Sequence, residues 1–88
     1  IDGKDRAAAL GTGFCLMEMG QDADALELFD EAVKDFPDAA EAFCNRAILF
    51  SRTGRHAEAE ADLRRAAALA PGEPQTWNNL GEVLGKQD

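Results

Sequence analysis

GQDADALELFDEAVKDFP, residues 20–37, returns 34 positions later as GRHAEAEADLRRAAALAP, residues 54–71. Five positions are identical between the two stretches: the opening glycine, three alanines and the closing proline. Self-similarity at a fixed period is the mark of a repeat architecture, so the rest of the chain is best read in this register. Its 88 residues hold roughly two and a half copies of the 34-residue unit.

Each copy reads as two helices. In the first, small or apolar residues recur at i, i+4 and i+7, as Phe43, Ala47 and Phe50 do. This spacing places them on one stripe of an amphipathic helix. The second helix occupies the quoted stretch, and the two together form an αα-hairpin repeated in tandem. The pattern predicts one all-α domain of five helices.

Turn signals separate these helices at the same place in each copy. Gly20 and Gly54 suit the left-handed residue that follows a helix end. Pro37 and Pro71 stop each second helix, because the residue before a proline is pushed out of helical geometry.

Composition narrows the class of partner. Apolar residues make up 45% of the chain, which is ordinary for a folded domain. No apolar run approaches the ~18–20 residues that a membrane span needs. The net charge is −8, and residues 18–41 carry nine acidic side chains against one lysine. An acidic block repels phosphate backbones, so we expect neither nucleic acid nor a membrane as the partner; the block is read as a solvated helix face.

The register resembles that of the tetratricopeptide repeat, whose 34-residue unit shows Trp-x-x-Leu-Gly-x-x-Tyr, then Ala-x-x-x-Phe, then Pro. The matching residues are Trp77, Leu80, Gly81 and Leu84 (where the family prefers tyrosine) in copy three, Ala25, Phe29 and Pro37 in copy one, and Ala59, Leu63 and Pro71 in copy two. The resemblance implies an αα-hairpin solenoid, a right-handed superhelix, over residues 1–88. Its units would be repeat one (about 6–39), repeat two (about 40–73) and a half repeat or capping helix (about 74–88). Whether the chain is a fragment of a longer protein is left open.

In such a stack, small residues let helices approach closely and large apolar side chains fill the remaining space. The expected core residues are Gly13, Leu16, Ala25, Phe29, Phe43, Ala47, Phe50, Ala59, Leu63, Trp77, Gly81 and Leu84. Emptying an aromatic core site costs about 3–5 kcal/mol, so Trp77→Ala is expected to be that damaging.

In the family that the chain resembles, the first helices of successive repeats line a concave groove for a partner peptide or helix. Carried over position by position, the groove residues are Leu10, Phe14, Met17, Cys44, Asn45, Ile48, Arg52, Asn78, Glu82 and Lys86. Leu10, Phe14 and Met17 form one apolar helical stripe, and exposed apolar stripes mark interaction sites. The resemblance therefore implies a scaffold that binds another protein or peptide.

Two alternatives bear on the partner. One subgroup of the family holds acidic chaperone tails with a clamp of lysines, arginine and asparagines. The corresponding positions here are Leu10, Phe14, Asn45, Gln75 and Asn79, of which only Asn45 fits. Without cations a terminal carboxylate gains no charge-assisted bonds, so this specialisation is rejected. The other alternative stays open: a self-assembling homo-oligomer that stacks through its exposed ends, or a regulatory domain excised from a larger protein.

Residues able to do chemistry are few and scattered. His56 and Glu60 are four apart on a helix, but no further ligand has a recognisable spacing, and His56 is expected at the surface. Cys15 and Cys44 lack a histidine partner and are expected to be buried free thiols in a reducing, cytoplasmic compartment. Residues 11–13 read Gly-Thr-Gly, but the chain lacks the strand before them and the lysine after them that a phosphate loop needs. We expect no enzymatic activity, cofactor or metal.

Overall fold

The computed structural model describes residues 6–86, with side chains from residue 8 onward, and all regular structure in this range is helical. The helices run in the order α1 (Arg6–Glu18), α2 (Asp22–Asp35), α3 (Ala40–Arg52), α4 (His56–Leu69) and α5 (Pro74–Lys86). The prediction of an all-α chain of five helices is confirmed.

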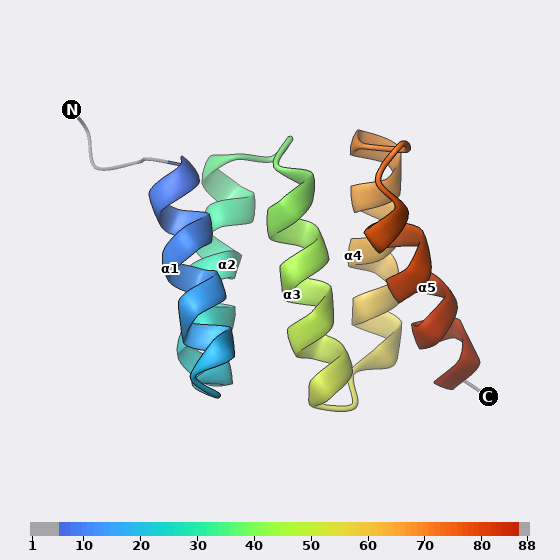
Figure 1. The fold of residues 1–88 in the computed structure, drawn as a ribbon, viewed down its shortest axis with the longest axis horizontal. Helices are drawn as coiled ribbons and strands as arrows, with labels where there is room; N and C mark the ends of the chain where they lie inside the picture. The colour runs from blue at the N-terminus through green and yellow to red at the C-terminus, as the bar shows by residue number, and fades with distance from the viewer. Residues whose placement is uncertain (1–5, 87–88) are drawn as a thin grey trace.

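The helices form two layers, with α1, α3 and α5 in front of α2 and α4 in the view of Figure 1. Successive helices pack against each other, and α3 also touches α1 and α5. The array is elongated, with principal extents of 45 × 27 × 18 Å. Because α3 contacts all four other helices, it is the element through which the two ends of the array are joined.

The two hairpin turns have the same backbone design. Gly20 and Gly54 have φ of 80° and 82°, and they are the only residues with positive φ in the described range. After each glycine, the next N–H reaches back to a carbonyl of the last helical turn: Gln21 to Leu16 at 2.9 Å, and Arg55 to Phe50 at 2.8 Å. This is the Schellman pattern, which satisfies carbonyls that the helix end leaves open. The glycine turns predicted from the sequence are therefore present.

Substitution of Gly54 by alanine should lower the free energy of unfolding by about 1 kcal/mol, because a Cβ is strained at positive φ although there is open space around it. Gly72→Ala is the control, since Gly72 is also a turn glycine with open space but lacks positive φ. Urea denaturation of the two variants checks this. Equal stability of the two would contradict the role given to φ at Gly54.

Two apolar clusters make up the core. One lies between α1, α2 and α3 and contains Phe29, which is fully buried, and Leu49. The other lies between α3, α4 and α5 and contains Leu63, also fully buried, and Leu80. Leu26 packs against both clusters, so the core is continuous along the array.

Most of the expected core residues are enclosed. Ala25, Phe29, Ala47, Phe50, Ala59 and Leu63 lie buried in the two clusters, Leu16 and Phe43 pack on them half-buried, and Gly13 is buried. A Cβ added to Gly13 would lie 2.5 Å from Cζ of Phe29. Only glycine lets α1 approach the Phe29 ring this closely, which explains this residue inside a helix.

Three expected core residues, all on α5, are not core. Trp77 and Leu84 are 51% and 42% exposed, and Gly81 is open. The physical reason lies in the register. One period earlier, Phe43 and Phe50 belong to or pack on the cluster that α3 shares with α4, but within residues 6–86 no helix follows α5 to cover the same face.

Candidate partner-binding groove

Two hollows lie along α3 and α5. The first, of about 230 Å³, is lined near the C-terminal ends of these helices by Ile48, Arg52, Glu82 and Lys86, among others. Its remaining lining is Ala47, Ser51, Leu63, Asn79 and Val83. An apolar floor with a polar and charged rim can hold one side chain of a partner and orient it.

The second hollow, of about 450 Å³, lies toward the N-terminal ends of the same helices. Cys44 and Asn45 line it from α3, Gln75 and Thr76 from α5. The other lining residues are Asp38, Ala40, Glu41, Leu69, Ala70 and Glu73. We call the two hollows together the α3–α5 groove.

A side-chain contact crosses between α3 and α5 where the two hollows meet. The Asn79 amide, which lines the first hollow, approaches the Cys44 sulfur, which lines the second, at 3.5 Å from Nδ2 to Sγ. Gln75 in turn donates to Oδ1 of Asn79 at 3.2 Å. These contacts orient the Asn79 amide and place polar side-chain groups between the two hollows.

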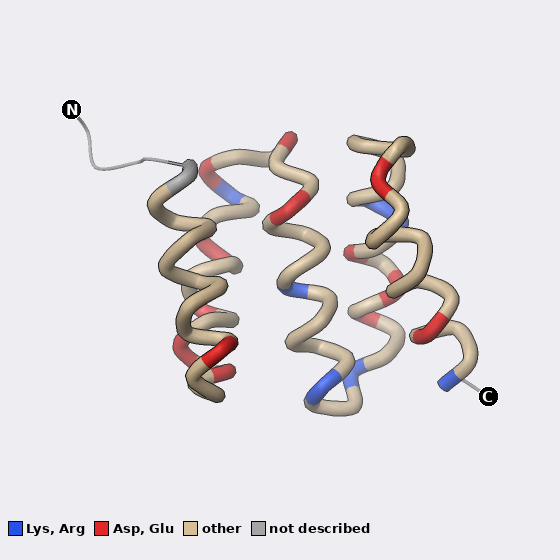
Figure 2. Tube along the Cα trace, viewed as in Figure 1, with Lys and Arg blue, Asp and Glu red and all other residues tan. Residues whose placement is uncertain are grey.

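The charges along the groove are unequal. Asp38, Glu41 and Glu73 line the second hollow, whereas Arg52 and Lys86 lie at the first, together with Glu82. Figure 2 shows this as red near the N-terminal ends of α3 and α5 and blue at their C-terminal ends. A bound segment would therefore meet an acidic end and an end with two cations.

Arg52 also has a structural role. Its Nη1 lies 3.0 Å from Oδ1 of Asp22 and 3.4 Å from the carbonyl oxygen of Met17. These bonds tie the end of α3 to the turn between α1 and α2. Arg52, predicted as a groove residue, therefore lines the first hollow and also takes part in an internal ion pair.

The predicted groove residues divide into two groups. The structure brings Cys44, Asn45, Ile48, Arg52, Glu82 and Lys86 together around the two hollows. Four others lie elsewhere: Leu10 packs half-buried on the first cluster, Phe14 is 50% exposed on α1, Asn78 is exposed on α5, and Met17 is buried. The expectation for Met17 was wrong, because this side chain is 4% exposed and belongs to the cluster that α1, α2 and α3 share.

Sequence reasoning missed the contribution of the turn between α4 and α5. Ala70 and Glu73 line the second hollow from this turn, next to Leu69 at the end of α4. Groove positions taken from first helices alone cannot include them. The Pro-Gly-Glu-Pro run at residues 71–74 is the signal for a tight turn there.

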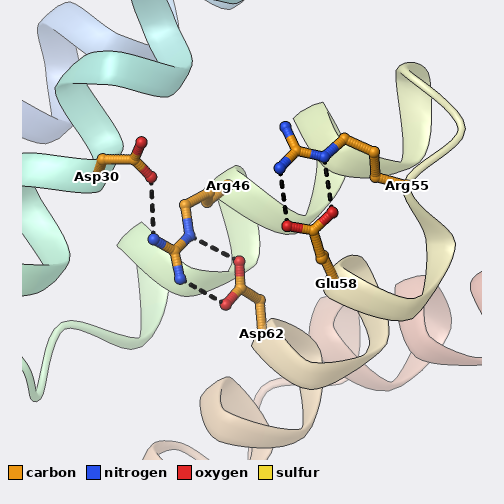
Figure 3. Close-up of polar contacts among 5 residues, drawn as sticks. All are labelled: Asp30, Arg46, Arg55, Glu58 and Asp62. Atoms are coloured by element: carbon orange, nitrogen blue, oxygen red, sulfur yellow. Dashed lines mark hydrogen bonds and ion pairs between the residues drawn. The ribbon is translucent and has the colours of Figure 1, made fainter.

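An ion-pair cluster lies in contact with α3 and was not anticipated (Figure 3). Arg46 on α3 binds Asp62 on α4 in a bidentate pair, with both N···O distances at 2.8 Å, and Asp30 on α2 at 3.0 Å. The Asp62 side chain is 8% exposed and that of Arg46 19%. Hydrogen bonding to Asp62 raises the pKa of Arg46, with attraction to Asp30 adding to it and burial opposing it. We call these residues the Arg46 cluster.

The guanidinium of Arg46 also lies over the rings of Phe50 and Phe43, at 5.4 and 5.8 Å from their centroids. Arg46 therefore joins α2, α3 and α4 while covering part of the apolar core. It fixes the helix that supplies half of the α3–α5 groove.

Residues considered for chemistry remain scattered. His56 is half-buried at the start of α4, and its Nδ1 is enclosed without a hydrogen-bond partner. Cys44 is buried, but Cys15 is exposed, contrary to expectation, because it faces away from both clusters on α1. Across residues 6–86 there is no grouping of three or more His, Cys, Asp or Glu side chains suited to a metal. The described helices are also too short or too polar to cross a membrane.

Helical hairpins stacked in tandem, with a hollowed face formed by first helices, define a class, the helical-repeat proteins. The sequence model of one family of this class, described as the tetratricopeptide repeat, matches residues 16–74. The chain belongs to the tetratricopeptide repeat family.

Solved structures agree on the fold. The Sgt2 TPR domain from Aspergillus fumigatus has a TM-score of 0.82 and 24% identity, over 89% of this chain and 52% of that one. The first TPR of Spaghetti (RPAP3), bound to the HSP90 peptide SRMEEVD, has a TM-score of 0.86 and 20% identity, over 94% and 66%. YrrB, described as a TPR protein with an unusual peptide-binding site, has a TM-score of 0.81 and 23% identity, over 88% and 40%. This chain thus spans about half to two thirds of the first two structures.

Proposed function

We propose that the chain is a protein-interaction module that binds an extended segment of a partner protein in the α3–α5 groove. The observation that carries this proposal is the pair of adjoining hollows, lined by six of the predicted groove residues. Two structural relatives are described by the peptide they bind or by a peptide-binding site, which supports the same use of the fold here. The units we propose are two full repeats, about 6–39 and 40–73, and a half repeat, about 74–88, in one domain.

The lining favours a partner with an apolar anchor and an acidic or other acceptor group beside it. Ile48 and Val83 offer apolar surface in the first hollow, and Arg52 and Lys86 offer donors at its rim. These donors can bond a carboxylate or carbonyl group of a partner, with Glu82 at the same rim and Arg52 also paired to Asp22. The positions of the chaperone-tail clamp are uncharged here, so the proposed partner is a different one.

The test is a peptide-display selection on the wild-type domain, with the recovered peptides measured against two variants of equal net charge. Ile48→Glu with Lys86→Glu should weaken binding by at least about tenfold, because a carboxylate replaces the apolar anchor site and a cation is reversed. Lys34→Glu with Ala57→Glu, at exposed sites on α2 and α4, should leave binding unchanged.

Isothermal titration gives the affinities and thermal melts show that each variant is folded. Lys86→Glu alone is a further check, since this exposed side chain contributes nothing to the core. Peptides that bind the groove variant as well as the control variant would contradict the proposal. The self-assembly alternative predicts instead a mass above that of one chain in light scattering at raised concentration.

A further inference from the structure

The second hollow of the α3–α5 groove carries an excess of negative charge. Within residues 6–86, the charged residues that line it are all acidic: Asp38, Glu41 and Glu73. The N-termini of α3 and α5 lie at the same hollow and contribute about half a positive charge each, so about two of the three negative charges remain uncompensated by the helices. The charge of this hollow therefore favours a cationic group of a partner.

The carboxylates keep acceptor positions for a ligand. Asp38 and Glu41 each also take part in an interaction within the chain. A carboxylate has two oxygens with about four acceptor positions, so one internal contact does not use them all. Glu73 lies on the exposed turn between α4 and α5, at the opposite side of the hollow from α3.

The amide network between the two hollows adds a neutral acceptor. Asn79 donates through Nδ2 to Sγ of Cys44, and Gln75 donates through Nε2 to Oδ1 of Asn79. Because the amide nitrogen of Gln75 bonds Asn79, its Oε1 remains as an acceptor for a group in the second hollow, which Gln75 lines. Thr76, 1% exposed, lines the same hollow with a hydroxyl that can accept as well. A cation with several donors is therefore the complementary ligand.

The chain already binds one arginine among acidic side chains, away from both hollows. Arg46 donates through Nε and Nη2 to Asp62 and through Nη1 to Asp30. A guanidinium has five donors in a planar fork and can bond several acceptors at once, whereas an ammonium group has three donors on one nitrogen. Arginine is thus better matched than lysine to a hollow with acceptors on α3, on α5 and on the turn before α5.

The distance between the hollows sets the spacing of the residues that a partner segment places in them. Cys44 in the second hollow and Ser51 in the first are separated by about 10 Å along the axis of α3, at 1.5 Å per residue. An extended chain advances about 3.3 Å per residue. Side chains bound in the two hollows therefore lie about three residues apart in the partner.

We propose that the second hollow binds an arginine side chain of the partner segment, about three residues from the apolar side chain that the first hollow holds. This inference rests on the proposed function, because it names a side chain of the segment bound in the same groove. It adds a second determinant of partner choice to the apolar anchor. A segment with an acidic residue at this place is rejected, because like charges repel.

The probe is a displayed library of short peptides with leucine fixed at the centre and random residues elsewhere, selected on the wild-type domain. Arginine should be enriched on one side of the leucine, about three residues away. In a recovered peptide, citrulline in place of this arginine keeps the shape of the side chain and removes its charge. Isothermal titration should show binding weakened at least about tenfold by this replacement.

Glu41→Gln with Glu73→Gln removes two charges from the hollow, so the two peptides should then differ in affinity by about twofold or less. Glu27→Gln with Glu31→Gln, at exposed sites on α2, gives the same net charge and should keep the tenfold difference. A general loss of stability does not remove this difference, because both peptides are measured on the same folded variant. Glu73→Gln alone, on an exposed turn outside the helices, should reduce the difference in part.

Two results would overturn this proposal alone. One is a set of peptides that lose affinity for the Ile48→Glu and Lys86→Glu variant but show no enrichment of arginine, or prefer lysine. The other is a difference between the arginine and citrulline peptides that survives in Glu41→Gln with Glu73→Gln. Peptides that bind the Ile48→Glu and Lys86→Glu variant as well as wild type would overturn the proposed function, and this inference with it.

Discussion

Phe29→Ala should lower the free energy of unfolding by about 3–5 kcal/mol, the range for emptying an aromatic core site. Phe29 is fully buried, belongs to the first cluster and fills the space that Gly13 leaves on α1. A domain of this size is stable by only about 5–10 kcal/mol, so the variant should be close to unfolding at room temperature. Urea titration monitored by circular dichroism, with a stabilising osmolyte if needed, measures the difference.

Trp77→Ala is the contrasting variant, and the motif alone would rank it as equally damaging. With its indole half exposed, truncation should cost about 1 kcal/mol or less, mainly through the hydrogen bond to Pro71. A loss for Trp77→Ala that matches the loss for Phe29→Ala would contradict the surface position of Trp77. A small loss for Phe29→Ala would mean that the first cluster repacks around the gap.

The 34-residue repeat period predicts most of the fold. The copies starting at Gly20 and Gly54 predict where the hairpins turn, and the positive φ of both glycines has the steric cause that the sequence reading gave. A 34-residue register also assigns each position to a face, which is why Phe29, Ala47 and Leu63 were expected inside and lie inside. Local pattern suffices here because each hairpin contacts only its neighbours.

The repeat register alone does not predict burial where a residue is buried only if a neighbouring helix packs on it. In the earlier copies, a second helix packs on the position that corresponds to Trp77. Within residues 6–86 no helix follows α5, and the residues of α5 alone do not predict this exposure. Met17 fails in the opposite sense, since α1, α2 and α3 enclose it although its counterpart one period later, Ser51, lines a hollow. The position of a residue within a repeat predicts on which face of its helix it lies, but not whether another helix covers that face.

The Arg46 cluster could not be predicted from the sequence, for a different reason. Arg46 stands where the third copy has Leu80, so the family pattern predicts an apolar contact there. The sequence did show an arginine next to an apolar stripe, and acidic residues on both neighbouring second helices, but these do not specify which residues pair. Pairing across three helices depends on tertiary distances, and sequence spacing does not supply these.

Arg46 and the groove are linked through α3. This helix places Asn45 and Ile48 in the groove, while Arg46, between them in sequence, holds the helix to α2 and α4. Preorganised binding surfaces keep their shape because neighbouring side chains fix them. We therefore expect loss of Arg46 to weaken both folding and peptide binding.

Arg46→Met should lower the free energy of unfolding by about 2–4 kcal/mol, because Asp62, nearly enclosed, loses its guanidinium and keeps its charge. Asp62→Leu should cost less, since Arg46 retains Asp30. The double variant Arg46→Met with Asp62→Leu should recover most of the loss, as apolar pairs can replace buried ion pairs at little cost. A double-mutant cycle from urea titrations gives the coupling energy between the two residues.

The exposed pair of Arg55 and Glu58 is the matched control, with side chains 47% and 51% exposed and a closest N···O distance of 2.6 Å. Its cycle, with Arg55→Met and Glu58→Leu, should give a coupling of about 0.2–1 kcal/mol that shrinks in 0.5 M salt, because exposed charges are screened by water and ions. The coupling of Arg46 with Asp62 should be larger and keep most of its value in salt. Equal couplings for the two pairs would contradict the enclosed position of the Arg46 cluster. If the cycle of Arg46 with Asp62 is additive, Arg46 stabilises α3 through its contacts with Phe43 and Phe50 instead.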